Sequence, residues 1–256
     1  MSRLLDQWQR WWFEPAPLLG LDQPDLVTMQ RAAWATTSAL VLAGIGVLTR
    51  PALLAAFLLL LVQEGLLMSF GKTDHATIPL LYALLFFALS PCDRRFSVTA
   101  LARRMLGRDL GPSESTFARW PTELLYVVLS SFYFSAGLSK LRVSGLRWVD
   151  GNTLQFHLLQ KQVPLGIEFA EFPWLCAVAS ALVLSWQIGF PLGLVRQLRP
   201  AFLLGGVAFH LGTGFLMNVW FWPVPYLYLV FVPWSRLATT ALLRLRPAAT
   251  APADPR

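Results

Sequence analysis

Long uncharged blocks dominate the pattern of hydrophobic and polar positions along the chain. Six stretches lack Asp, Glu, Lys and Arg altogether, and they cover residues 32–49, 51–63, 76–90, 124–139, 172–195 and 201–235. Most of them approach the roughly 17 to 25 residues that a helix needs to cross a bilayer. The last block is long enough for two helices, and Pro223 and Pro225 predict a break because proline removes a backbone donor. The pattern therefore predicts an all-α, polytopic transmembrane helical bundle of about seven spans, with no soluble domain.

Composition supports a membrane protein and sets the domain organisation. The chain is 55% hydrophobic and 14% charged, with a mean hydropathy of +0.53, whereas soluble domains are about 25% charged. Residues 1–30 combine charges with a tryptophan-rich stretch and are predicted to be an interfacial segment. Residues 31–242 form the predicted transmembrane domain. Within it, the sequence of residues 97–106 predicts a short amphipathic helix on the membrane surface. The Pro- and Ala-rich tail, 243–256, is expected to be disordered.

The basic residues predict an orientation in the membrane. The formal net charge is +7, and in the seven-span arrangement about 13 of the Lys and Arg residues fall on one face and about 8 on the other. The positive-inside tendency then places the N-terminus outside and the C-terminus in the cytoplasm of a cell (inner) membrane. No basic stripe interleaved with aromatic residues is present, so nucleic acid is not an expected partner. The expected partners are membrane lipid and a membrane or periplasmic protein.

One face of the predicted helix over 124–139 carries most of the candidate chemistry. Tyr126, Ser130, Tyr133, Gly137 and Lys140 follow one another at intervals of four, three, four and three residues, which places them on one side of a helix. Two phenols, a hydroxyl and an ammonium along one groove suit a flat apolar ligand with a polar head. In the alternative interpretation, Lys140 extends to the lipid head groups and the tyrosines belong to an aromatic belt.

Three further polar residues are candidates. Glu64 directly follows the second uncharged block, about one and a half turns inside the outer end of the predicted second span, where it could pair with Lys140 or Arg142, or bond to a neighbouring helix. His75 precedes the third block on the predicted outer side and could act as a general acid or base, or simply be solvated. His210 lies mid-span among glycines and either bonds across helices or faces a ligand. No zinc-site spacing or phosphate loop is present, so neither a metal nor a nucleotide is expected.

Several stretches together resemble the integral-membrane region of the vitamin K-dependent gamma-carboxylases and their bacterial relatives, the HTTM (horizontally transferred transmembrane) domain proteins. The first is YFSAGLSKL, followed by WVDG, which is similar to the family's Tyr-Phe-x-Ala-Gly-x-x-Lys-Leu and Trp-x-x-Gly. The others are GKTDHATIPLLYALLFFALSP, FSVTAL and AFHLGTGFLMNVWFWP. The likeness extends over about residues 15–236.

The resemblance implies a chemistry. In the carboxylases a lysine of this motif deprotonates reduced vitamin K, and by position that lysine is Lys140. A quinone or quinol cofactor, and quinol-coupled redox or carboxylation chemistry, are therefore expected, with Lys140 as the candidate base. The family's active-site histidine falls at Ile78, and His75, one turn earlier, is the second catalytic candidate. The candidate cofactor-binding residues are Tyr126, Tyr133, Gly137, His210 and Glu64.

The sequence also bears on other functions. The carboxylases carry a large soluble domain after the last span that helps to hold a protein substrate, and the present sequence shows none, so carboxylation of a large protein is not expected. The alternative function is a non-catalytic membrane subunit that docks a partner complex. Transport is less favoured, because the sequence shows no interrupted helix pair in matching halves.

Overall fold

A computed structural model describes residues 24–68, 75–93, 97–107 and 119–234. Within these ranges the chain has ten α-helices and no strand, which confirms the predicted all-α fold. The predicted tail and most of the predicted interfacial segment lie outside the described residues. The helices are α2 (Leu26–Ile45), α3 (Thr49–Met68), α4 (Ile78–Leu89), α5 (Val98–Met105), α6 (Trp120–Ser144), α7 (Asn152–Lys161), α8 (Pro164–Ala170), α9 (Pro173–Gly189), α10 (Arg199–Met217) and α11 (Pro223–Tyr228). Short 3₁₀ segments join some of them: η1 (His75–Thr77), η3 (Gly145–Asp150), η4 (Phe190–Leu194) and η5 (Leu229–Phe231).

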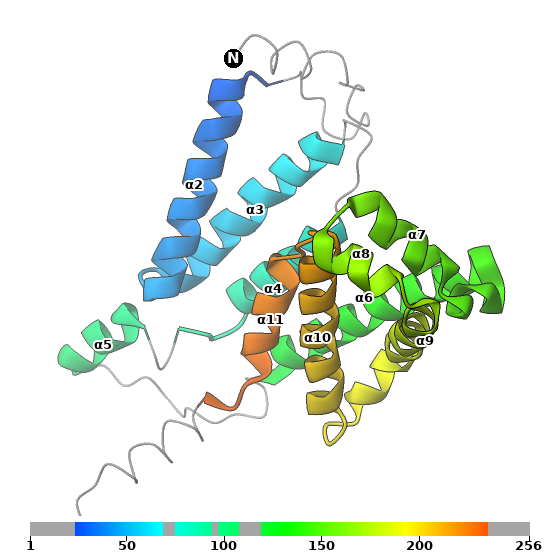
Figure 1. Ribbon diagram of the computed structural model, residues 1–256. Helices are drawn as coiled ribbons and strands as arrows, with labels where there is room; N and C mark the ends of the chain where they lie inside the picture. Colours follow the sequence, from blue (N-terminus) through cyan, green and yellow to red (C-terminus); the bar gives the residue numbers. More distant parts are fainter. Residues whose placement is uncertain (1–23, 69–74, 94–96, 108–118, 235–256) are drawn as a thin grey trace, which may run out of the picture.

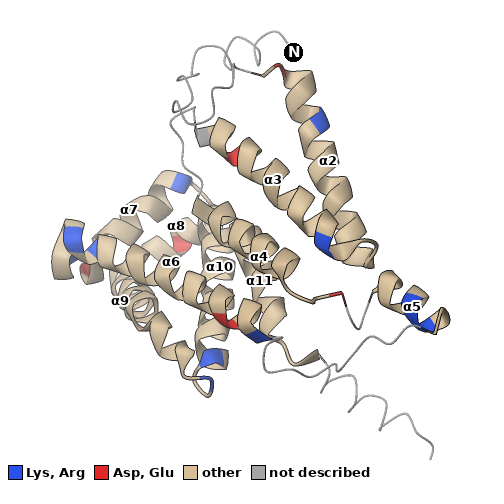
Figure 2. Ribbon diagram, turned by 180° about the vertical axis from the view of Figure 1, so that it is seen from behind, with Lys and Arg blue, Asp and Glu red and all other residues tan. Residues whose placement is uncertain are grey.

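Four described segments are long and apolar enough to cross a membrane, and they suggest a multi-pass membrane protein. They are Thr49–Leu67, Trp120–Asp150, Pro173–Leu194 and Arg199–Met217. Figure 2 agrees with this, because Lys, Arg, Asp and Glu lie mostly near the helix ends and leave long uncharged stretches between them. The segment His75–Leu89 is apolar but shorter, and α11 has only six residues. Seven spans therefore stay a prediction.

Helix α2 begins earlier than the uncharged block because Asp25 caps it. The Asp25 carboxylate accepts a hydrogen bond of 2.7 Å from the backbone N–H of Thr28, as N-cap side chains do. Hydrogen bonding from Thr28 also holds the pKa of the Asp25 carboxyl below its ordinary value. The helix ends at Gly46, whose φ of +82° is the left-handed conformation that favours glycine.

The helices pack as a chain of neighbours (Figure 1). Helix α3 packs against α2 and α4, and α4 packs against α6 and α11. Helix α6 then contacts α9, η3 and η4, while α10 contacts α8, α9 and α11. The α2–α3 hairpin accordingly stands to one side of the other helices in Figure 1. The main core lies around α6, and η4, α11 and α4 contribute buried side chains to it.

The helical structure of the last uncharged block is interrupted at Asn218, five residues before Pro223, where the break was predicted. Helix α10 ends at Met217, and Asn218 takes a left-handed φ of +52°. Pro223 then occupies the first position of α11, where its missing N–H and fixed φ favour helix initiation. The prolines thus start the next helix, while Asn218 ends the preceding one.

The helix predicted over 97–106 is present as α5, and its place on the membrane surface stays a prediction. The hydroxyl of Ser97 caps it by accepting a hydrogen bond of 2.9 Å from the N–H of Ala100. Thr99 joins it to the α2–α3 turn, because its hydroxyl donates to the carbonyl of Gly46 at 2.9 Å and accepts from the N–H of Leu48 at 3.3 Å. Helix α5 is therefore held at the end of the hairpin.

Candidate functional site

A cavity of about 660 Å³ lies where the end of α6 meets α7, α9 and α10. Its wall is mostly apolar, and side chains from α9 and α10 form most of it. Polar or hydrogen-bonding side chains contribute a small part, and they are Lys140, Trp148, His157, Ser180 and Thr213. A mainly apolar cavity with a few polar groups is the usual form of a small-molecule site, and volumes of roughly 300–1,000 Å³ are typical.

Lys140 is the one charged side chain of the candidate α6 face, and it lines this cavity. Its ammonium lies 3.4 Å from the carbonyl oxygen of Ala136 and 5.2 Å from the centre of the Trp148 ring. Within the part of the chain that the structure describes, it forms no ion pair with a carboxylate. The ammonium is therefore half-buried against an apolar cavity, and only weak partners lie close to it.

Two other lining residues carry buried polar atoms that have no partner in the described ranges. They are the indole Nε1 of Trp148 and the hydroxyl of Ser180. Ser180 as a whole is 2% exposed. A buried donor without an acceptor is costly, so Trp148 and Ser180 each offer the cavity lining a polar atom that lacks a partner among the described residues.

The predicted α6 face exists, but most of it points into the protein core. Tyr126, Ser130, Tyr133 and Gly137 are all buried, as the helical spacing predicts. None of these four residues lines the cavity, which Lys140 alone reaches from this face. Gly137 instead allows close packing of α6 on α9, because a Cβ there would lie 2.9 Å from the side chain of Ile188.

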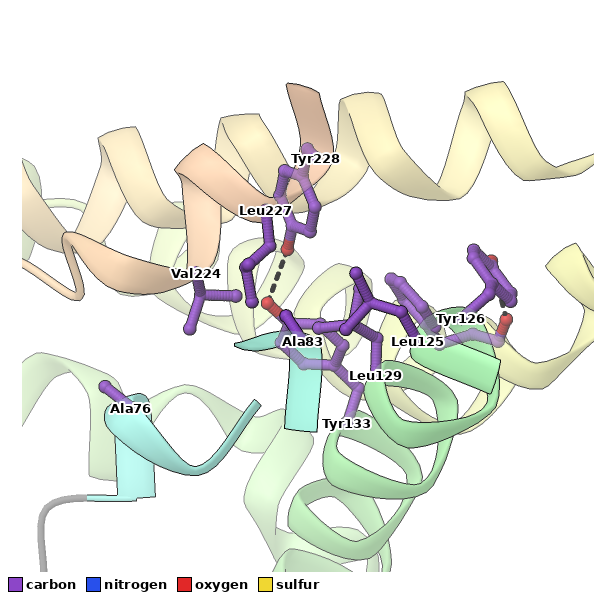
Figure 3. Close-up of a cluster of buried hydrophobic side chains, with 10 residues drawn as sticks. Ala76, Ala83, Leu125, Tyr126, Leu129, Tyr133, Val224, Leu227 and Tyr228 are labelled. Carbon is purple, nitrogen blue, oxygen red and sulfur yellow. Dashed lines mark hydrogen bonds between the residues drawn. The ribbon is translucent and has the colours of Figure 1, made fainter. Parts of the chain in front are cut away.

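Tyr133, His210 and Tyr228 form a buried polar cluster that joins α6, α10 and α11. The Tyr133 hydroxyl lies 2.8 Å from Nε2 of His210. It also hydrogen-bonds with the hydroxyl of Tyr228 (Figure 3). The ring of Tyr133 also packs on Trp186, with 4.6 Å between the ring centres. Since Trp186 lines the cavity, the cluster lies behind the cavity wall. His210 therefore bonds across helices, which was one of its two interpretations.

Sequence reasoning missed an ion-pair cluster at the opposite end of α6. Arg199 and Arg196 lie 2.7 Å and 2.9 Å from the two carboxylate oxygens of Glu123. The Arg199 guanidinium also donates to the carbonyl of Gly193 at 3.1 Å and stacks 4.4 Å above the ring of Tyr126. A charged residue within the first turn of each of two spans, Glu123 after Pro121 and Arg199 before Pro200, was the available signal.

The remaining two candidates lie away from the cavity. His75 is exposed in η1, beside α4 and α11. Glu64 is on α3, and α4 packs between α3 and α6, the helix that carries Lys140. The structure thus brings neither residue to the cavity that Lys140 lines.

Comparisons with models of protein families, with curated proteins and with solved structures gave no match. The resemblance drawn from the sequence motifs therefore stays a prediction, and the site has to be interpreted from its own geometry. That geometry is a largely apolar cavity in which Lys140 is the one lining residue with a formal charge.

Proposed function

We propose that this multi-pass membrane protein binds an elongated apolar ligand of the quinone or lipid class in the cavity between α6, α7, α9 and α10. The observation that carries the proposal is the 660 Å³ volume combined with an apolar wall and a single ammonium, that of Lys140. A ligand with a long apolar body would cover the wall, and its polar head would lie at the Lys140 end. We further propose that the whole chain forms a bundle of about seven membrane spans and that this cavity lies within it.

The lining residues fit a quinone. Trp186 and Phe209 lie in the wall and are stacked on each other, with 5.3 Å between their ring centres, so the cavity offers flat aromatic surface. Lys140, Trp148 and Ser180 supply hydrogen-bond donors that suit the oxygens of a quinone ring. A bound quinol would supply two-electron redox chemistry. The motif resemblance to the carboxylase and HTTM family points to the same class of ligand.

In this proposal Lys140 is the candidate base: in its neutral amine form, its Nζ atom could take a proton from a ligand hydroxyl, which would leave the ammonium paired with the ligand oxyanion. A largely apolar wall would limit water around that atom. Tyr133 and His210 would act from behind the wall, by fixing α10 and α11 against α6 through their hydrogen bonds. His75 has no role at this cavity.

A cavity-filling substitution tests the proposal. Gly212 lines the cavity and a Cβ there meets no atom within 4 Å, so Gly212→Leu fills space without displacing the backbone. Gly44 in α2 offers a matched control, because a Cβ there also meets nothing within 4 Å and it does not line the cavity. Native mass spectrometry with lipid extraction would be run on the wild type and on both variants.

We expect a bound amphiphile in the wild type and in Gly44→Leu, and its loss in Gly212→Leu. Equal amounts in all three proteins would show that the amphiphile binds elsewhere and would overturn the proposal. A folded Gly212→Leu is recognised by the same elution volume and thermal midpoint as Gly44→Leu.

A further inference from the structure

The charges around the cavity restrict the chemistry of its ligand. Among the residues that line it, Lys140 and His157 are the titratable ones, and no Asp or Glu belongs to the lining. Among the described residues, the partners recorded for the Lys140 ammonium are a carbonyl at 3.4 Å and an aromatic ring at 5.2 Å. These partners leave most of its charge uncompensated, and a charge within a membrane span is costly unless it is paired.

Two other hydrogen-bonding residues of the cavity lining point to the same conclusion. Trp148 and Ser180 each carry a buried polar atom with no partner among the described residues, and both line the cavity with Lys140. An indole N–H and an ammonium only donate, and a hydroxyl can donate. An ionised oxygen acid is the complementary group, because it accepts several hydrogen bonds and carries the missing charge.

The rest of the wall suits an apolar body. Gly212 on α10 leaves open space along one side of the cavity, because a Cβ there would meet no atom within 4 Å, and Leu182 and Val183 on α9 line another part of it. No charged side chain belongs to this part of the wall. A molecule that carried charges at both ends would therefore be disfavoured.

We infer that the ligand is an amphiphile whose head group carries an anionic oxygen, and that Lys140 forms an ion pair with it. The inference rests on the proposed function and names the substrate class of that site. A long-chain carboxylate and an apolar ring with an acidic hydroxyl share this chemistry. A neutral ester, alcohol or alkyl ether of the same shape does not.

Two matched pairs of probes test the inference on the full chain in lipid nanodiscs. The first pair is hexadecanoate and hexadecanol, and the second is a hydroxynaphthoquinone and its methyl ether. Dissociation constants would be measured for the wild type, for Lys140→Met and for Lys161→Met. Lys161 is the control because it is exposed at the end of α7 and does not line the cavity.

We expect the anionic member of at least one pair to bind about tenfold or more tightly than its neutral partner, since a charge-assisted hydrogen bond contributes that much. This preference should fall below about twofold in Lys140→Met, as the same charge-assisted bond is lost, and persist in Lys161→Met. Tighter binding of hexadecanoate than of hexadecanol would identify the ligand as a lipid with a carboxylate head group. Tighter binding of the hydroxynaphthoquinone than of its methyl ether would identify it as an apolar ring with an acidic hydroxyl.

Equal binding of acid and neutral probe by the wild type would overturn the inference and leave the proposed function intact, and this comparison needs no variant. A preference that survives in Lys140→Met would also overturn it. If no probe binds and Gly212→Leu retains the co-purified amphiphile, the proposed function fails as well.

Discussion

Removing the charge of Glu123 should destabilise the fold more than removing the charge of Arg196, its exposed partner. Glu123 lies between Arg199, whose side chain is 11% exposed, and Arg196, whose side chain is 61% exposed. Arg199 is also held by the carbonyl of Gly193 and by the ring of Tyr126. In Glu123→Gln the Arg199 guanidinium would keep its buried position and lose its counter-charge.

The magnitude follows from the burial of the two partners. Breaking a buried ion pair by removing one partner costs about 3–5 kcal/mol, whereas an exposed pair contributes about 0–1 kcal/mol. The Glu123 side chain is 35% exposed, so the expected loss lies between these cases, at about 2–3 kcal/mol. For a chain of this size that corresponds to a midpoint lower by about 5–10 °C.

Thermal unfolding in one detergent would measure the effect, with Arg196→Gln as the matched control. Arg196 contacts the same carboxylate from an exposed position, so its loss should cost less than about 1 kcal/mol. The double variant Glu123→Gln/Arg199→Gln should recover part of the loss, because no unpaired charge stays buried. The reasoning is refuted if Glu123→Gln is no more destabilising than Arg196→Gln.

Two further substitutions test the packing that positions the cavity. Tyr133→Phe removes the hydroxyl that bonds with both His210 and Tyr228, and should cost about 1–3 kcal/mol because those buried groups lose a partner; an unchanged unfolding midpoint would contradict this. Gly166→Ala would place a Cβ against the backbone carbonyl of Leu216, and should cost about 1–3 kcal/mol through overpacking of α8 on α10; a thermal midpoint at or above that of the wild type would show that the two helices can separate freely.

The sequence carried enough information for most of the helices. Several uncharged blocks are nearly long enough for a helix that crosses a bilayer. In a membrane the backbone polar groups must bond within the segment, so a helix is the simplest structure for such a block. Helix ends were less accurate, since they depend on single capping residues. Asp25 starts α2 before the uncharged block begins, and Asn218 ends α10 before the prolines.

The site was predicted only in part. The spacing on α6 correctly grouped the buried Tyr126, Ser130, Tyr133 and Gly137 with Lys140, because helical periodicity is a local property. Which neighbour each side chain meets depends on tertiary packing, which spacing within one helix does not determine. The pairing of Tyr133 with His210, 77 residues apart, and that of Glu123 with Arg199, 76 residues apart, therefore had to come from the structure.

An experimental structure of the purified protein in lipid nanodiscs would test the central claim most directly. The account predicts an elongated density between α9 and α10 that ends within about 4 Å of the Lys140 ammonium, the distance of an ion pair. A cavity closed by side chains, or a Lys140 side chain turned to the lipid head groups with no ligand beside it, would contradict the account.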